Sequence, residues 1–109
     1  HLRIRCRIVL KEGHIMYFVV SYKYNAAADS QMDEAEIKTI FKNHVRYLKQ
    51  LYEDKKLFMA GPFAGMKDGI VVLETETAGD ASEIMGHDPA LESNLFSGTL
   101  YEWQVGFKR

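Results

Sequence analysis

A run of apolar residues at three- and four-residue steps, between residues 31 and 55, most constrains how this chain can fold. The apolar positions are Ile37, Ile40, Phe41, Val45, Leu48, Leu51 and Tyr52. This spacing is typical of one face of an amphipathic α-helix that packs against a larger apolar surface. Asp33, with Glu36 three residues later, resembles a capping box and indicates where the helix begins.

His44 stands in the middle of this apolar stripe, four residues after Ile40 and four before Leu48. Burying an ionisable side chain without a partner costs about 1–3 kcal/mol or more. The imidazole is therefore expected either to be hydrogen-bonded in the core or to line a cavity. The residues alone favour the first interpretation, a core histidine that a backbone group satisfies.

The segments around the helix predict an alternation of strands and helices. Aromatic and β-branched residues, or a two-residue alternation, mark the strands, and the second helix ends at Asp88-Pro89 because the residue before a proline avoids the helical conformation. Gly61-Pro62 is expected to stop the second strand, and residues 25–30 and 65–69 are expected to be a loop and a turn. The predicted strands are 15–24, 57–60, 69–76 and 99–107, and the predicted helices are 31–55 and 80–87.

The resulting order, β-α-β-β-α-β, predicts an α+β fold of the ferredoxin-like kind, with an antiparallel sheet and both helices on one face. The other face would remain uncovered. Tyr101, Trp103, Val105 and Phe107 alternate along the last strand and give that face a large apolar surface. A second copy of the chain could cover it, which predicts a homodimer or a higher oligomer.

Composition excludes several classes of function. A formal net charge of −1 gives no electrostatic reason to expect a nucleic-acid partner, and no apolar run is long enough for a membrane span, so a cytoplasmic protein is the default expectation. Cys6 is the single cysteine, which excludes an internal disulfide. The four histidines have no metal-ligand spacing, so neither a metal nor another cofactor is expected.

The first fourteen residues are expected to lie outside the main domain, which spans residues 15–109. Within residues 2–10, apolar positions alternate with arginines and predict an extra edge strand with a basic outer face. The alternative is that residues 1–14 were added to the natural protein, since a complete domain can be read from Met16 onward.

Four short motifs, taken in order, resemble the YciI-like (YCII-related) family. They are N-H-V-R-Y-L around His44, L-F-M-A-G-P at 57–62, G-I-V-V-L-E at 69–74 and H-D-P at 87–89. The resemblance covers roughly residues 16 to 108. It implies a dimeric α/β barrel with a cleft between sheet and helices, in which His44 and Asp88 match a proposed catalytic pair and Gly61-Pro62 matches a turn beside the cleft.

The resemblance also implies a chemistry, because one known activity in the family eliminates HCl from a chlorinated hydroxyhydroquinone. The leading hypothesis is a cofactor-independent lyase or isomerase acting on a small cyclic or aromatic metabolite. His44 would be the general base and Asp88 would orient it. The side chains expected to hold the substrate, beside Gly61 and Pro62, are Tyr22, Phe63 and Phe58. The alternatives are a non-catalytic binding or regulatory module and cofactor-free oxygen chemistry.

Overall fold

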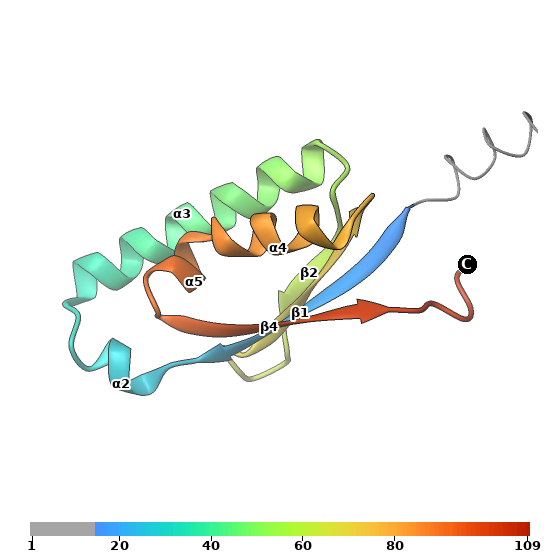
Figure 1. Cartoon of the computed structure of the whole chain (residues 1–109). Coiled ribbons are helices and arrows are strands. Elements are labelled where there is room, and N and C mark those ends of the chain that lie inside the picture. The colour runs from blue at the N-terminus through green and yellow to red at the C-terminus, as the bar shows by residue number, and fades with distance from the viewer. Residues whose placement is uncertain (1–14) are drawn as a thin grey trace, which may run out of the picture.

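The chain forms one four-stranded antiparallel sheet, with α3 and α4 packed on the same face of it (Figure 1). The computed structural model describes residues 15–109, so the predicted strand at 2–10 and the extension at 1–14 lie outside the described residues. The elements are β1 (Met16–Tyr24), α2 (Ala26–Asp29), α3 (Glu34–Glu53), β2 (Leu57–Pro62), β3 (Gly69–Thr75), α4 (Ala78–Gly86), α5 (Pro89–Glu92) and β4 (Phe96–Trp103). The strand order β2-β3-β1-β4 confirms the ferredoxin-like arrangement.

Some boundaries differ from the predicted ones. The expected loop at 25–30 contains α2, because the Asn25 side chain accepts a hydrogen bond from the Ala28 N–H and caps a short helix. β2 continues through Gly61-Pro62 instead of stopping there, since an edge strand tolerates a proline that lacks the N–H donor. β4 begins three residues early, at Phe96, which pairs with Tyr24 of β1.

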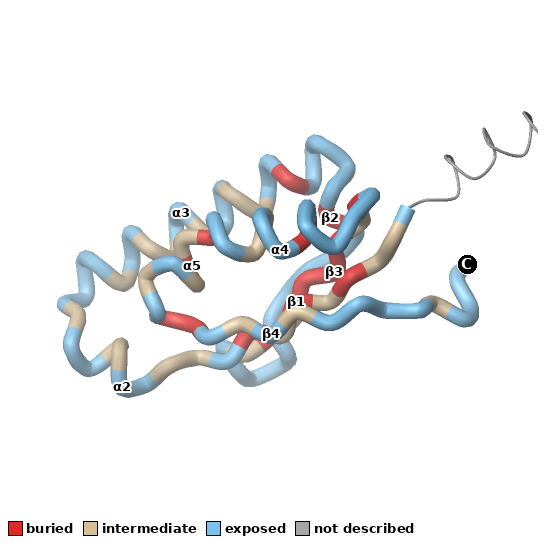
Figure 2. The backbone as a smooth tube through the Cα atoms, viewed as in Figure 1, coloured by how far each residue is buried: buried red, intermediate tan, exposed pale blue. Residues whose placement is uncertain are grey.

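The core lies between the sheet and the helices. Alternate residues of the two central strands are buried on the helix-covered face, with one exception in β3, where Val72 is buried although it lies on the other face. Figure 2 shows the buried segments in red. β1 contributes Phe18, Val20 and Tyr22 to this layer, and β3 contributes Val71 and Leu73. This alternation follows from the two-residue period of a strand with one face packed on the core.

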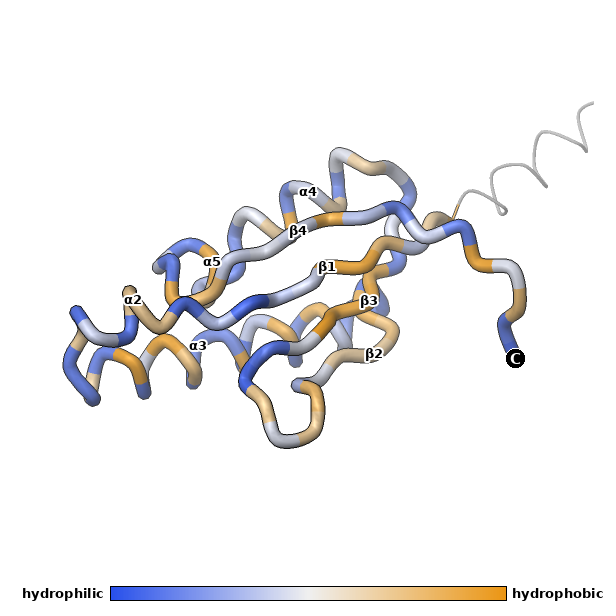
Figure 3. Tube along the Cα trace, turned by 90° about the horizontal axis from the view of Figure 1, so that it is seen from below, coloured by the Kyte–Doolittle hydropathy of each residue, from blue (hydrophilic) through white to orange (hydrophobic). Residues whose placement is uncertain are grey.

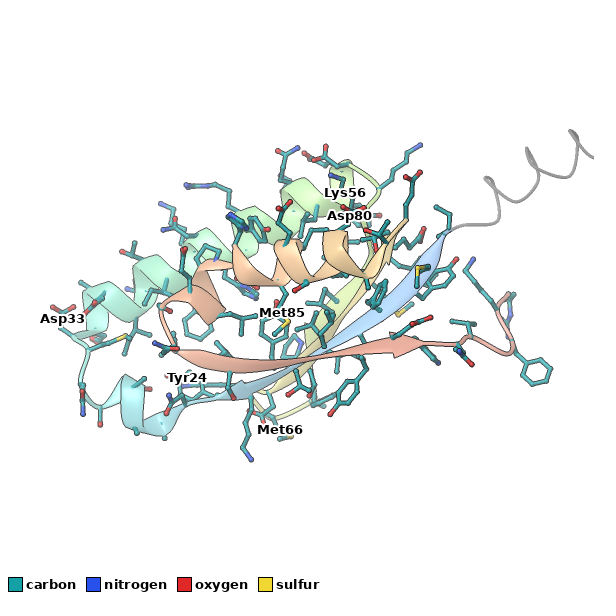
Figure 4. All side chains as sticks on the ribbon, viewed as in Figure 1. Tyr24, Asp33, Lys56, Met66, Asp80 and Met85 are labelled. Carbon is teal, nitrogen blue, oxygen red and sulfur yellow. The ribbon has the colours of Figure 1, made fainter. Side chains whose placement is uncertain are left out.

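Two glycines, Gly69 and Gly98, permit close packing between neighbouring elements. At Gly69, an added Cβ would lie 2.4 Å from the Gly61 carbonyl oxygen, so the two arms of the β2–β3 hairpin approach more closely than a side chain allows. At Gly98, a Cβ would meet the side chains of Leu91 and Met85, at 2.9 Å and 3.1 Å. Met85 extends from α4 toward the sheet in Figure 4. The absence of a side chain at Gly98 therefore allows α4 and α5 to pack against β4.

The opposite face of the sheet is open and partly apolar. Register places Val19, Val72 and Tyr101 in one row across this face. Figure 3 views the sheet from this side, with the helices behind it and hydrophobic segments along β1 and β3. Tyr101 and Trp103 are 56% and 49% exposed, whereas Val105 and Phe107 follow the end of β4 rather than lie in it. None of the helices within residues 15–109 has the length and hydropathy to cross a membrane.

Candidate active site

The two residues that the motifs single out, His44 of α3 and Asp88 before α5, are in direct contact. The imidazole Nδ1 lies 2.8 Å from Asp88 Oδ1. The two positions are 44 residues apart in the chain, and α3 and α5 pack against each other to bring them together. The His44 side chain is 16% exposed and the Asp88 side chain 1%, so the imidazole is the more accessible partner.

Asp88 is a buried carboxylate with a hydrogen-bond donor on each oxygen. It is the N-cap of α5, where Oδ1 accepts the Ala90 N–H at 2.9 Å as well as the bond from His44. Oδ2 accepts a hydrogen bond from the hydroxyl of Tyr22 in β1. Pro89 at the first helical position fixes the local backbone without losing a needed donor. Asp88-Pro89 therefore both ends α4 and places a carboxylate within hydrogen-bond distance of His44 Nδ1.

Tyr22 is held in its protonated form. Burial, followed by the charge of Asp88 and the hydrogen bond to it, raises the pKa of the Tyr22 hydroxyl far above its ordinary value. A neutral phenol can donate to a carboxylate, whereas a phenolate would repel it. Tyr22 thus remains a donor to Asp88 over the whole physiological pH range.

The contact with Asp88 determines which tautomer of neutral His44 fits the site. A carboxylate only accepts hydrogen bonds, so Nδ1 must carry the proton, and Nε2 keeps its lone pair. We assign this tautomer from the hydrogen-bond geometry. Neutral His44 therefore has a proton acceptor at the ring nitrogen remote from Asp88.

A cavity of about 720 Å³ adjoins His44, between α3 and the β2–β3 hairpin. Its walls are mostly apolar and aromatic. The residues that line it are Tyr22, Phe41, His44, Val45, Leu48, Lys49, Tyr52, Leu57, Phe58, Met59, Ala60, Gly61, Pro62, Lys67, Gly69, Ile70, Val71 and Phe96. His44 belongs to this lining and Asp88 does not, so the imidazole lies between the carboxylate and the cavity. The volume of the cavity is that of a typical small-molecule site.

Aromatic rings surround the imidazole on the sheet side. The rings of Tyr22 and Phe96 lie 5.5 Å and 6.3 Å from that of His44, centroid to centroid, and Phe96 is nearly parallel to it. Tyr24 packs on the far side of Phe96 at 5.1 Å. A planar ligand entering the cavity would thus meet an aromatic wall beside the histidine.

The structure brings most of the predicted site residues together. Tyr22, Gly61 and Pro62 line the cavity with His44, and so does Phe58. Phe63 lies outside the lining and is 46% exposed, because it begins the turn after β2. Among residues 15–109, no group of three or more His, Cys, Asp or Glu side chains could hold a metal ion.

Sequence reasoning missed several members of the site. Phe96 precedes the predicted last strand at 99–107, but its pairing with Tyr24 places it in β4 beside His44. Val45 and Leu48 were assigned to the buried stripe of α3, yet they line the cavity. Leu48 lies four residues after His44, and Val45 lies four residues after Phe41, so each shares a helix face with another lining residue. Lys67 had no sequence signal beyond its place in a turn.

Comparison with other proteins identifies the family. The model of the YCII-related domain matches residues 16–104. The uncharacterized protein YjpA of Bacillus subtilis (strain 168) is 34% identical over 62 residues, which make up 57% of this chain and 73% of that protein.

A solved structure also shares the fold. It is 5-chloro-2-hydroxyhydroquinone dehydrochlorinase (TftG) from Burkholderia phenoliruptrix AC1100, in complex with 2,5-dihydroxybenzoquinone. The likeness has a TM-score of 0.64 at 20% sequence identity and covers 84% of this chain and 96% of the other, so it extends to the whole fold. From the domain match and the sequence similarity, this chain belongs to the YCII-related family.

Proposed function

We propose that this protein is a cofactor-independent lyase or isomerase that moves a proton on a small cyclic or aromatic metabolite. The observation that carries the proposal is the position of His44, whose imidazole lies between a buried carboxylate and an apolar cavity. A general base must present a lone pair to the substrate and must have its new positive charge stabilised. Nε2 meets the first requirement and Asp88 meets the second.

The proposed step is the transfer of a substrate proton to Nε2 of His44. In an elimination, the electron pair of the broken bond forms a new double bond, and a leaving group such as chloride departs with the electron pair of its own bond. In an isomerisation, the pair forms a new double bond, the existing double bond shifts, and the proton held on His44 returns to the substrate at the far end of the shifted system. Asp88 stabilises the imidazolium through Nδ1, and Tyr22 and the Ala90 N–H hold Asp88 in place. The dehydrochlorination named for the structural neighbour belongs to this reaction class.

The choice of a cyclic or aromatic substrate follows from the walls of the cavity. Flat aromatic rings stack favourably on other rings at centroid distances of roughly 4.5–7 Å. Phe41, Phe96 and Tyr22 offer such surfaces beside His44. The solved neighbour is in complex with 2,5-dihydroxybenzoquinone, which is a cyclic molecule.

The test is turnover by wild-type protein and His44→Gln across chlorinated and unchlorinated hydroxyhydroquinones. Chloride release reports elimination, and exchange of substrate protons with solvent deuterium reports proton abstraction without elimination. Because general base catalysis typically contributes about 10²–10⁴-fold, His44→Gln should lower kcat at least about 100-fold. Its melting temperature is the control for folding.

Activity of His44→Gln within a few-fold of wild type would refute the base assignment. A ligand that raises the melting temperature but emerges unchanged, without proton exchange, would instead support a binding or regulatory module. Consumption of oxygen with a hydroquinone substrate would favour cofactor-free oxygen chemistry.

The proposal includes a homodimer formed through the open face of the sheet. Val19, Tyr101 and Trp103 provide apolar surface that a second copy would cover. Trp103→Lys should shift the protein from dimer to monomer in sedimentation equilibrium, because it places a charge in the interface. A monomeric wild type would refute this part of the proposal without affecting the assignment of His44.

A further inference from the structure

We propose that the substrate is an anion, and that Lys67, in the loop between β2 and β3, binds its negative group at the rim of the cavity. This inference rests on the proposed function, because it assigns the substrate class for the same cavity. It adds a specificity determinant to the catalytic group of His44, Asp88 and Tyr22.

The charged side chains that line the cavity are all basic, and the Asp88 carboxylate lies behind the lining, bonded to His44 and Tyr22. Lys49 and Lys67 line it together with His44, and none of its described lining residues is Asp or Glu. Within residues 15–109, His44–Asp88 is the only ion pair, so neither lysine is neutralised by a carboxylate within 4 Å there. A cavity with low-dielectric walls and one sign of charge favours a ligand of the opposite sign.

The loop holds Lys67 in place through bonds on both sides of it. The Asp68 side chain accepts the Tyr24 N–H at 2.8 Å, which ties the loop to the end of β1. The Asp68 carbonyl accepts the Phe63 N–H at 2.8 Å, and the Phe63 carbonyl accepts the Met66 N–H at 3.0 Å. Figure 4 labels Met66 in this loop and Tyr24 at the end of β1. The backbone of Lys67 is therefore anchored relative to the sheet.

The ammonium group of Lys67 lies against the aromatic wall of the site. Its Nζ is 4.3 Å from the centre of the Tyr24 ring, within the range of a cation–π contact. Tyr24 in turn packs on Phe96, and Phe96 packs on His44. Tyr24 lies outside the cavity lining, whereas Lys67 and His44 both belong to it. One ligand in the cavity can therefore present its negative group to Lys67 and its reacting atom to His44.

Lys67 is a better candidate than Lys49 for this role. Both lysines are exposed, and Lys49 lies five positions after His44 on α3. Among residues 15–109, no ion pair or cation–π contact holds the ammonium group of Lys49. Lys67 has both the anchored loop and the contact with Tyr24. The two lysines can be separated by experiment because they lie on different elements.

The test compares two ligands that differ in charge and hardly in shape, 2,5-dihydroxybenzoate and 2,5-dihydroxybenzamide. Their affinities are measured by calorimetry or ligand-observed NMR for wild type and Lys67→Met. Wild type should bind the acid about fivefold more tightly than the amide, the upper range for a charge pair at an exposed site. Lys67→Met should remove this preference by weakening the acid alone, and added salt should reduce it in wild type.

Three variants serve as controls. Lys67→Arg should keep the preference for the acid, because the charge remains. Lys42→Met removes an exposed lysine of α3 that does not line the cavity, and it should leave both affinities unchanged. Lys49→Met should change the ratio of the two affinities less than Lys67→Met does.

The proposal is wrong if wild type binds the two ligands equally, if it binds neither, or if Lys67→Met weakens both alike. It is also wrong if Lys49→Met is the variant that removes the preference. Binding measured in His44→Gln separates this inference from the proposed function. If His44→Gln still prefers the acid over the amide, the role of Lys67 is supported even if His44 proves not to be catalytic. If wild type turns over its substrate fully but shows no preference between the acid and the amide, only the role of Lys67 is contradicted.

Discussion

Within residues 15–109, an aspartate is the N-cap of two helices, and the two aspartates have very different surroundings. Asp33 caps α3 by accepting the Glu36 N–H at 2.7 Å, and Asp88 caps α5 by accepting the Ala90 N–H at 2.9 Å. Asp33 is exposed and has this cap alone, whereas Asp88 is 1% exposed and also accepts bonds from His44 and Tyr22.

The difference shows how a helix N-cap can also become part of a functional site. At Asp33 the capping bond replaces a bond to water, and its net value is modest. At Asp88 the same bond pins a carboxylate that two other side chains use as an acceptor in a water-poor interior, where each bond is worth more and an unpaired partner costs more. The comparison predicts a large difference in stability between equivalent substitutions.

The largest effect is expected for Asp88→Ala. It removes a cap and leaves the Tyr22 hydroxyl and the His44 Nδ1–H without an acceptor, so it should lower the free energy of unfolding by about 3–5 kcal/mol. Asp33→Ala is the matched control and should cost about 1 kcal/mol, the usual value of an N-cap. Urea unfolding of both variants measures the difference. Equal losses would mean that the additional bonds of Asp88 contribute nothing.

A smaller loss is expected for Tyr22→Phe. This change keeps the aromatic ring and removes the hydroxyl, which leaves Asp88 Oδ2 buried without its donor, at a cost of about 1–3 kcal/mol. Tyr24→Phe is the matched control, because the Tyr24 hydroxyl donates to Asp29, a carboxylate that is only half-buried. Tyr24→Phe should cost less in the same unfolding experiment. The reverse order would contradict the importance of burial at Asp88.

The smallest effect is a dependence of stability on alkaline pH. Burial and the hydrogen bond to Asp29 raise the pKa of Tyr24 from 10.0 to about 12. A phenol whose pKa is raised by folding contributes stability that is fully present below pH 10 and is lost as the pH rises toward 12. Unfolding free energies measured across this range should fall less steeply in Tyr24→Phe than in wild type. Identical slopes would show that the hydroxyl is not perturbed.

The periodicity of the sequence predicts the sheet, the two longer helices and the position of His44 within a packed face. It does not predict the end of β2 or the start of β4, because pairing across the sheet, such as Tyr24 with Phe96, determines those boundaries. The family motifs identify His44 and Asp88 as candidate site residues, and the packing of α3 on α5 places them in contact. Phe63 and Lys67 belong to the same turn after β2. The hydrogen bonds of this turn leave Phe63 outside the cavity lining and Lys67 within it. The local composition of the turn does not indicate which of the two residues lines the cavity.

Asp88 holds neutral His44 with its proton on Nδ1 and its lone pair on Nε2, and the function proposed for the site depends on this tautomer. Long-range ¹H–¹⁵N correlation NMR at a pH above the usual titration range of imidazole distinguishes the two tautomers directly, with the signal assigned from His44→Gln. Asp88→Ser is the informative variant, since serine keeps a capping side chain and lacks the carboxylate. We expect the Nδ1–H form in wild type and a shift away from it in Asp88→Ser. The Nε2–H form in wild type, or a tautomer that is unchanged in Asp88→Ser, would contradict this assignment.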